Sequence, residues 1–317
     1  MGVEAQGGLT EKSAEAEIFA KGRDMLSILG LMAALAASGP SPAGTDWSPA
    51  TIHRVQAQDS DRQQQADRLW QVLGMDRLMP VMQAEAVGEA ARMQAEGLIA
   101  GQGPDWARTV GRIHDPARLE RLFRDSLAEA LARTDAGLVD RALGFHASEL
   151  GQQVVGLEIS ARRAMLEEGV EPLARQSFAE ALDQGAPRAL AIRDIIDRAD
   201  LISPNVAGGL NAALAFARGF AQGDGFDMTP DPQQMVQDAW AQRDQIEAEA
   251  TAWLQGFLML AYAPLSDAEL ASYGAWAASA EGQALSRIVF AGFDGVFEHT
   301  SYEMGLAAAL RLQGRQL

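Results

Sequence analysis

Residues 138–152 read LVDRALGFHASELGQ, and residues 270–283 read LASYGAWAASAEGQ. Both stretches contain an aromatic residue, a serine three positions later, and a Gly-Gln pair three and four positions after the serine. Just upstream, residues 135–138 (DAGL) match residues 267–270 (DAEL), with a shift of one residue between the two matches. A chain that uses one helical unit twice is expected to consist of two related halves.

The repeated motif has properties that favour a structural role. Serine is a strong helix N-cap because its hydroxyl oxygen accepts a hydrogen bond from a free backbone N–H, so we expect both serines to begin helices. A glycine within a helix costs about 1 kcal/mol relative to alanine, so its recurrence indicates a close approach between helices. The aromatic residues would anchor the junction in the core. The motif residues are Phe145, Ser148, Gly151 and Gln152 in the first copy, and Trp276, Ser279, Gly282 and Gln283 in the second.

The composition favours helices throughout. Ala, Leu, Glu, Gln and Arg dominate, and these residues stabilise helices. Val, Ile, Thr and Tyr, which favour strands, are scarce. Apolar residues recur at spacings of three and four in most segments after residue 61. The sequence therefore predicts an all-α, multi-helix bundle without significant sheet, built from helical repeat 1 at residues 62–185 and helical repeat 2 at residues 186–317.

The first 43 residues have the pattern of a signal peptide. Residues 25–37 (MLSILGLMAALAA) are apolar, follow Lys21 and Arg23, and precede Ser41-Pro42-Ala43, which offers small residues for cleavage. The apolar run is shorter than the roughly 20 residues that span a bilayer. We expect cleavage near Ala43, export to the periplasm without a stable membrane anchor, and a solvated linker at residues 44–61. Several acidic residues before residue 25 indicate either a true start further downstream or an atypical leader.

Missing residue types exclude several kinds of chemistry. The chain has no cysteine, which excludes disulfides, thiol nucleophiles, Cys-ligated zinc and iron–sulfur clusters. The only lysines are Lys12 and Lys21, both in the expected leader, so the mature chain has none for a Schiff base or a phosphate-binding loop. The formal net charge of −17 disfavours nucleic acid and anionic lipid as partners.

Candidates for a metal site are weak. His146 and Glu149 lie three residues apart, but a helix that begins at Ser148 would spoil their geometry. A set of methionines on one helical face would suit copper(I), although core packing explains the same spacing more simply; these are Met75, Met79 and Met82. We therefore expect no metal and no other cofactor.

The second copy of the motif resembles a known family. Residues 265–270 (LSDAEL), followed by the motif from Trp276 to Gln283, are similar to the signature of the bacterial family called domain of unknown function 2059. The first copy departs from that signature, with Thr134-Asp135 in place of Leu-Ser and Gly137 in place of glutamate. The resemblance implies a helical, usually periplasmic protein, and it supplies no catalytic residues.

Two classes of function remain open. The favoured class is a non-enzymatic exported protein that binds a partner protein or an apolar ligand in the seam between its halves. The alternative is a hydrolase or lyase that uses a pair of carboxylates in the cleft between the repeats. A deep cleft with converging Glu, Asp and Arg side chains would favour the enzyme, and a shallow apolar groove would favour binding. The acidic candidates include Glu85, Glu89, Glu96, Glu158, Glu167, Glu168, Glu247 and Glu249.

Overall fold

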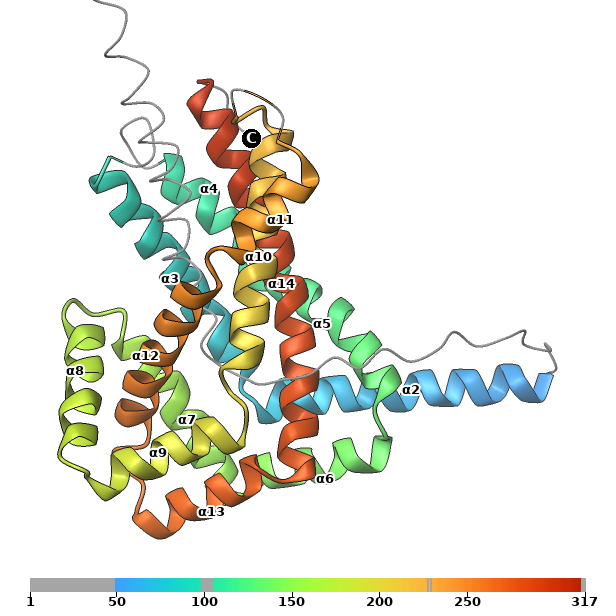
Figure 1. Cartoon of the computed structure of the whole chain (residues 1–317). Helices are drawn as coiled ribbons and strands as arrows, with labels where there is room; N and C mark the ends of the chain where they lie inside the picture. Colours follow the sequence, from blue (N-terminus) through green and yellow to red (C-terminus); the bar gives the residue numbers. More distant parts are fainter. Residues whose placement is uncertain (1–48, 98–104, 227, 229, 315–317) are drawn as a thin grey trace, which may run out of the picture.

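The computed structural model describes residues 49–97, 105–226, 228 and 230–314, and the side chains among them from residue 61 on. These residues form helices and no β-strand (Figure 1), which confirms the prediction of an all-α, multi-helix bundle. None of these helices is both long and apolar enough to cross a lipid bilayer. The helices are α2 (Pro49–Val72), α3 (Met75–Ala95), α4 (Asp105–Ile113), α5 (Pro116–Arg133), α6 (Ala136–His146), α7 (Glu149–Ala164), α8 (Val170–Asp183), α9 (Pro187–Arg198), α10 (Ser203–Gln222), α11 (Pro232–Trp240), α12 (Arg243–Ala261), α13 (Asp267–Ala277) and α14 (Ala280–Leu312).

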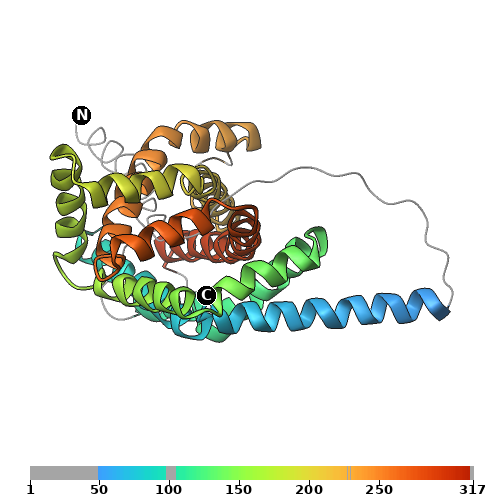
Figure 2. The ribbon, with the colours of Figure 1, turned by 90° about the horizontal axis from the view of Figure 1, so that it is seen from below.

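The N-terminal predictions have different outcomes. The expected signal peptide, residues 1–43, lies outside the described residues. The expected linker at residues 44–61 is wrong from Pro49 on, because α2 begins there. Proline suits the first turn of a helix, where its missing N–H is not needed, and no further proline or glycine follows before Val72. The N-terminal part of α2 extends away from the other helices in both views (Figures 1 and 2).

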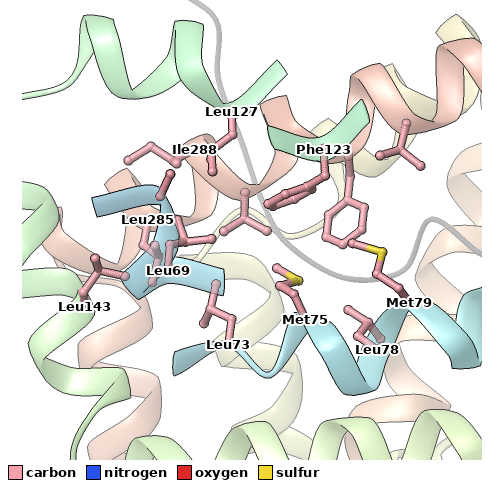
Figure 3. Close-up of a cluster of buried hydrophobic side chains, with 14 of the residues drawn as sticks. Leu69, Leu73, Met75, Leu78, Met79, Phe123, Leu127, Leu143, Leu285 and Ile288 are labelled. Carbon is pink, nitrogen blue, oxygen red and sulfur yellow. The ribbon is translucent and has the colours of Figure 1, made fainter. Parts of the chain in front are cut away.

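The two halves of the chain, α2–α7 and α9–α14, share their cores. One cluster of buried side chains combines α2, α3, α5, α6 and α7 with residues of α14, and Figure 3 shows Leu285 and Ile288 in it beside Leu69. A second cluster combines α8, α9, α12 and α13 with Val154 and Ala161 of α7. The last helix of each half therefore packs against the other half, α14 on α5 and α6, and α7 on α12 and α13.

The methionine stripe of α3 belongs to the first of these clusters. Met75 and Met79 are each 1% exposed, and Met82 is 2% exposed. Leu69, Leu73 and Phe123 lie in the same cluster (Figure 3). These thioether side chains therefore fill the core between α3 and α5.

Helices α10 and α14 form the closest helix pair of the second half (Figure 1). Glycines permit this approach, because a Cβ at Gly219 would overlap the carbonyl oxygen of Tyr302, and one at Gly305 would overlap that of Phe216. The C-terminal half of α14 is thereby held along α10 and also reaches α4 of the first half.

Helix order, length and neighbours recur between the halves. Helices α3 and α10 have 21 and 20 residues, α4 and α11 have 9 each, α5 and α12 have 18 and 19, and α6 and α13 have 11 each. Helix α2 packs against α5 and α6, as α9 packs against α12 and α13. The halves differ in their first helix, since α2 has 24 residues and α9 has 12, and in their last helix, since α7 has 16 residues and α14 has 33. Helix α8 connects them.

Candidate functional site

The repeated motif forms the same helix corner twice. Ser148 is the N-cap of α7, with its Oγ accepting from the Gly151 N–H at 3.2 Å and donating to the Phe145 carbonyl at 2.5 Å. Ser279 is the N-cap of α14, and its two corresponding distances are 3.1 and 2.5 Å. Both predicted N-caps are confirmed.

The motif glycines make the corner tight. A Cβ at Gly151 would overlap the carbonyl oxygen of Phe145, and one at Gly282 would overlap that of Trp276. The close approach predicted for these glycines therefore occurs between each helix and the helix directly before it. The glutamines follow in the first turn: Gln152 donates to the Val72 and His146 carbonyls at 2.8 and 2.6 Å, and Gln283 is half-buried.

The caps also correct the alignment of the two copies. Asp135 is the N-cap of α6 and Ser266 is the N-cap of α13. Asp135 precedes Ser148 by the same number of residues as Ser266 precedes Ser279. The one-residue shift inferred from matching DAGL with DAEL is therefore wrong, because Asp135 corresponds to Ser266 by its capping role.

The two corners meet at a seam between α6 and α7 of the first half and α12 and α13 of the second. A cavity of about 40 Å³ lies there, which we call the seam cavity. Its wall includes His146, Glu158, Tyr262, Tyr273 and Trp276. The motif residue Trp276 stacks on Phe145 and meets the His146 ring edge-on at 4.6 Å between centroids. The seam thus brings residues of both motif copies together.

Glu158 is the acidic group of the seam. It accepts a hydrogen bond from the Tyr262 hydroxyl at 2.6 Å and lies 3.4 Å from the Tyr273 hydroxyl. Burial raises the pKa of the Glu158 carboxyl to about 7, and the tyrosine hydrogen bonds offset part of that effect. Burial lowers the pKa of His146 to about 4. The His146 Nδ1 faces the Ala142 carbonyl one turn back but makes no hydrogen bond of normal geometry.

A larger cleft, of about 320 Å³, opens between α3 of the first half, α12 of the second, and α8 with the segment that leads into it. Charged side chains dominate its wall. Two of them are arginines, Arg92 and Arg175. The acidic ones are Glu85, Glu89, Glu96, Glu171 and Glu249.

A buried ion pair supports the wall at Glu85. Arg162 of α7 holds both carboxylate oxygens of Glu85, at 2.7 and 2.9 Å, and the two side chains are 4% and 11% exposed. The Arg162 guanidinium also lies over the Trp253 ring, 5.7 Å from its centroid. Burial raises the pKa of Glu85, although the neighbouring Arg162 opposes that shift. The pair joins α3 to α7 beneath an aromatic side chain of α12.

The other cleft arginines are paired as well. Arg175 of α8 lies between Glu171 at 2.6 Å and Glu249 at 2.9 Å, and so connects α8 to α12. The Arg175 Nε is buried without a hydrogen-bond partner. Arg92 pairs with Glu89 on α3. Carboxylates outnumber guanidinium groups in the cleft even when Arg162 is included, so the cleft is negatively charged.

The acidic candidates from the sequence separate into groups. Glu85, Glu89, Glu96 and Glu249 converge in the cleft, whereas Glu158 lies in the seam. Sequence reasoning missed Glu171 and the three arginines. Arg162 and Arg175 pair with Glu85 and Glu249 on other helices, which periodicity does not show. Arg92 and Glu171 pair within their own helices. Within the described residues, no group of three His, Asp or Glu side chains is placed to hold a metal ion.

The cleft and the seam cavity each bring charged or titratable side chains of different helices together around an open space. Comparison of the chain with protein-family models, curated proteins and solved structures finds no match. The resemblance of residues 265–283 to the family named above stays a prediction.

Proposed function

We propose that this protein is a non-enzymatic binding protein whose cleft between α3, α8 and α12 takes a small organic cation. The carrying observation is the cleft's excess of carboxylates, five glutamates against Arg92 and Arg175 on the wall. A volume of about 320 Å³ lies at the small end of the range for small-molecule sites. The net charge of the whole chain, −17, would raise the local concentration of a cation.

We infer further that the halves arose by duplication, and that the cleft results from their divergence. Helices α3 and α10 can be aligned on the left-handed residues that follow them, Gly97 with φ 77° and Asp224 with φ 55°. The cleft residues Glu85, Gly88 and Arg92 then correspond to Ala212, Ala215 and Gly219.

In the second half, this face of α10 is small, buried and covered by α14. In the first half, α7 ends at Ala164, and the cleft lies beside the corresponding face of α3. The cleft therefore lies where a longer α7 would pack, and Glu85 and Arg92 stand there in place of an alanine and a glycine. A merely structural surface would need no Glu85–Arg162 pair buried beneath it, because such pairs are costly to desolvate.

The charge of the cleft changes the ligand expected from the sequence. An apolar ligand would desolvate these carboxylates and give them no further hydrogen bond in return, whereas an alkylammonium group would form charge-assisted hydrogen bonds with them. Most of the glutamates already pair with arginines, which favours binding over acid–base chemistry at this place.

Calorimetric titration with 1,4-diaminobutane tests the proposal. We expect saturable binding that weakens with salt, and no binding of the neutral 1,4-butanediol. Glu249→Gln and Glu171→Gln should each weaken binding roughly tenfold, the loss of about one charge-assisted hydrogen bond. Glu129→Gln is the matched control, since Glu129 also pairs with an arginine but lies exposed on α5, away from the cleft. Equal binding of butanediol, or of a dicarboxylate, would contradict a cation site.

An activity assay tests the alternative that the protein is an enzyme. The cleft does bring Glu and Arg side chains together, the feature that favours a carboxylate-dependent hydrolase or lyase. Purified protein would be assayed against generic ester, glycoside and peptide libraries. Turnover that Glu171→Gln abolishes without unfolding the protein would replace the binding proposal with an enzyme.

We also propose export to the periplasm with removal of residues 1–43. The basic, apolar and small-residue pattern from Lys21 to Ala43 supports it. N-terminal sequencing of protein from a periplasmic extract is expected to begin near Gly44. Intact Met1 in the cytosolic fraction would overturn export.

A further inference from the structure

The seam cavity is separate from the cleft and draws its polar groups from both halves. Its volume of about 40 Å³ is room for about one to three water molecules. His146 of α6 and Glu158 of α7 come from the first half, and Tyr262 and Tyr273 from the second. His146 and Glu158 are only 3% and 5% exposed.

Glu158 is the polar link across this seam. The Tyr262 hydroxyl at the end of α12 donates to it at 2.6 Å, and the Tyr273 hydroxyl of α13 lies at 3.4 Å. The titratable groups around it are these tyrosines and His146, while Glu85 of α3 pairs with Arg162 one turn further along α7. Burial is the largest influence on the Glu158 carboxyl, so the neutral form is favoured there.

We propose that the seam cavity is a site for buried water and one proton, and that the protonated Glu158 carboxyl holds α7 against α12 and α13. A water in the cavity would provide a partner for the His146 ring and for the second oxygen of Glu158. Loss of the proton would leave an unpaired charge in the seam, so the seam would open to solvent. This inference does not depend on what the cleft binds.

The titration of the surrounding groups supports a switch near neutral pH. Burial raises the pKa of Glu158 to about 7. Burial lowers the pKa of His146 to about 4, so His146 is neutral over the same range and cannot compensate the charge. Burial also raises the pKa of Tyr273 and Tyr262 above their ordinary values, so both keep their hydroxyl protons.

Seam opening depends on pH because Glu158 binds its proton more tightly in the closed seam than in an opened one. Opening the seam would return the pKa of Glu158 from about 7 toward its ordinary value of 4.5. Rising pH through this range therefore favours opening, by about tenfold per pH unit, and the effect levels off above pH 7. His146 acts in the opposite sense, because opening raises its pKa toward 6.5.

Amide hydrogen exchange of α13 in the full chain tests the proposal, with Glu158→Gln as the comparison. Glutamine keeps an oxygen for Tyr262 but cannot ionise. The His146 contribution is common to both proteins, so it cancels in the ratio of their opening constants. We expect that ratio to rise about tenfold per pH unit between pH 4.5 and 7. A ratio that does not change with pH would overturn the proposal.

Two further measurements distinguish the ionisation of Glu158 from that of another buried acid. Asp294 of α14 also has a pKa raised by burial, to about 6, so Asp294→Asn is the control and should leave the pH dependence of α13 unchanged. Infrared difference spectra between the natural protein and Glu158→Gln should show a protonated carboxyl band that disappears around pH 7. If Glu158→Gln fails to fold, this band in the natural protein decides: its absence at pH 5.5 would overturn the proposal.

Discussion

Phe145 stacks face to face on Trp276, with ring centroids 4.3 Å apart and ring planes at 9°. The two residues hold the same position in their motifs, three residues before the capping serines Ser148 and Ser279. Contacts between equivalent positions are typical of a two-fold arrangement. This stack, together with the exchange of α7 and α14 between the cores, supports the proposed duplication.

Removing either capping hydroxyl should destabilise the protein. Ser148→Ala and Ser279→Ala each leave a first-turn N–H without its partner, and each should lower the free energy of unfolding by about 1 kcal/mol. Urea unfolding followed by circular dichroism measures the change. Ser160→Ala is the control, because Ser160 lies exposed within α7 and caps nothing. Losses that do not exceed the control would contradict the capping role.

The motif glycines should be far less tolerant than a nearby glycine of the same helix. Gly151→Ala and Gly282→Ala press a Cβ into a backbone carbonyl, so a loss of about 3 kcal/mol or more is expected. Gly156→Ala has open space around its Cβ and should gain up to about 1 kcal/mol in helix propensity. Thermal unfolding of the three variants compares them. A tolerated alanine at Gly151 would mean that the corner can relax.

The Glu85–Arg162 pair should show strong coupling. Arg162→Met alone leaves the Glu85 carboxylate buried without its partner, which should cost about 3–5 kcal/mol. The double variant Arg162→Met, Glu85→Met should cost much less, since no unpaired charge remains. A double-mutant cycle by urea unfolding gives the coupling energy. Additive losses would show that the pair is not held as the structure has it.

Acid should destabilise the fold through two buried histidines. Burial lowers the pKa of His114 and of His146 to about 4, from an ordinary value of 6.5. The unfolded chain therefore binds protons that the folded chain does not, and stability is lost as pH falls from 6.5 toward 4. Each histidine contributes on the order of 3 kcal/mol. The buried acids Glu158, Asp294 and Glu85 oppose the trend, because burial raises the pKa of each.

Urea unfolding at pH 6.5 and 4.5 measures this loss. His114→Gln should remove about half of the histidine effect. Glu158→Gln should steepen the overall dependence, because it removes an opposing group. A loss of stability between the two pH values that is as large in His114→Gln as in the natural protein would refute the assignment.

Local features of the sequence predicted local structure. Ser148 and Ser279 were predictable as caps because an N-cap depends on residues within one turn. The stripe of Met75, Met79 and Met82 was predictable as core by its spacing. The linker prediction was wrong after Pro49, since polar composition does not prevent a helix. Matching DAGL with DAEL shifted the alignment of the two copies by one residue. Asp135 corresponds to Ser266 because both are helix N-caps, although the residues differ.

Features that depend on distant helices were not predictable from periodicity. Glu85 meets Arg162, and Arg175 meets Glu249, across more than 70 residues of chain. The exchange of α7 and α14 between the two cores also leaves no trace in a helical stripe, because a stripe shows which face is buried but not against which partner. The charged cleft follows from these long-range contacts.

The unequal lengths of α7 and α14 also bear on the stoichiometry of the proposed binding. In a dimer of identical chains, both copies of a helix would have the same sequence and length. Such a dimer could not have an open groove beside one copy and a packed helix beside the other. A fused chain permits this asymmetry, with the cleft beside α3 and α14 packed beside α10. Binding in the cleft is therefore expected to follow a simple hyperbola with one ligand per chain, without the cooperativity that paired equivalent sites allow.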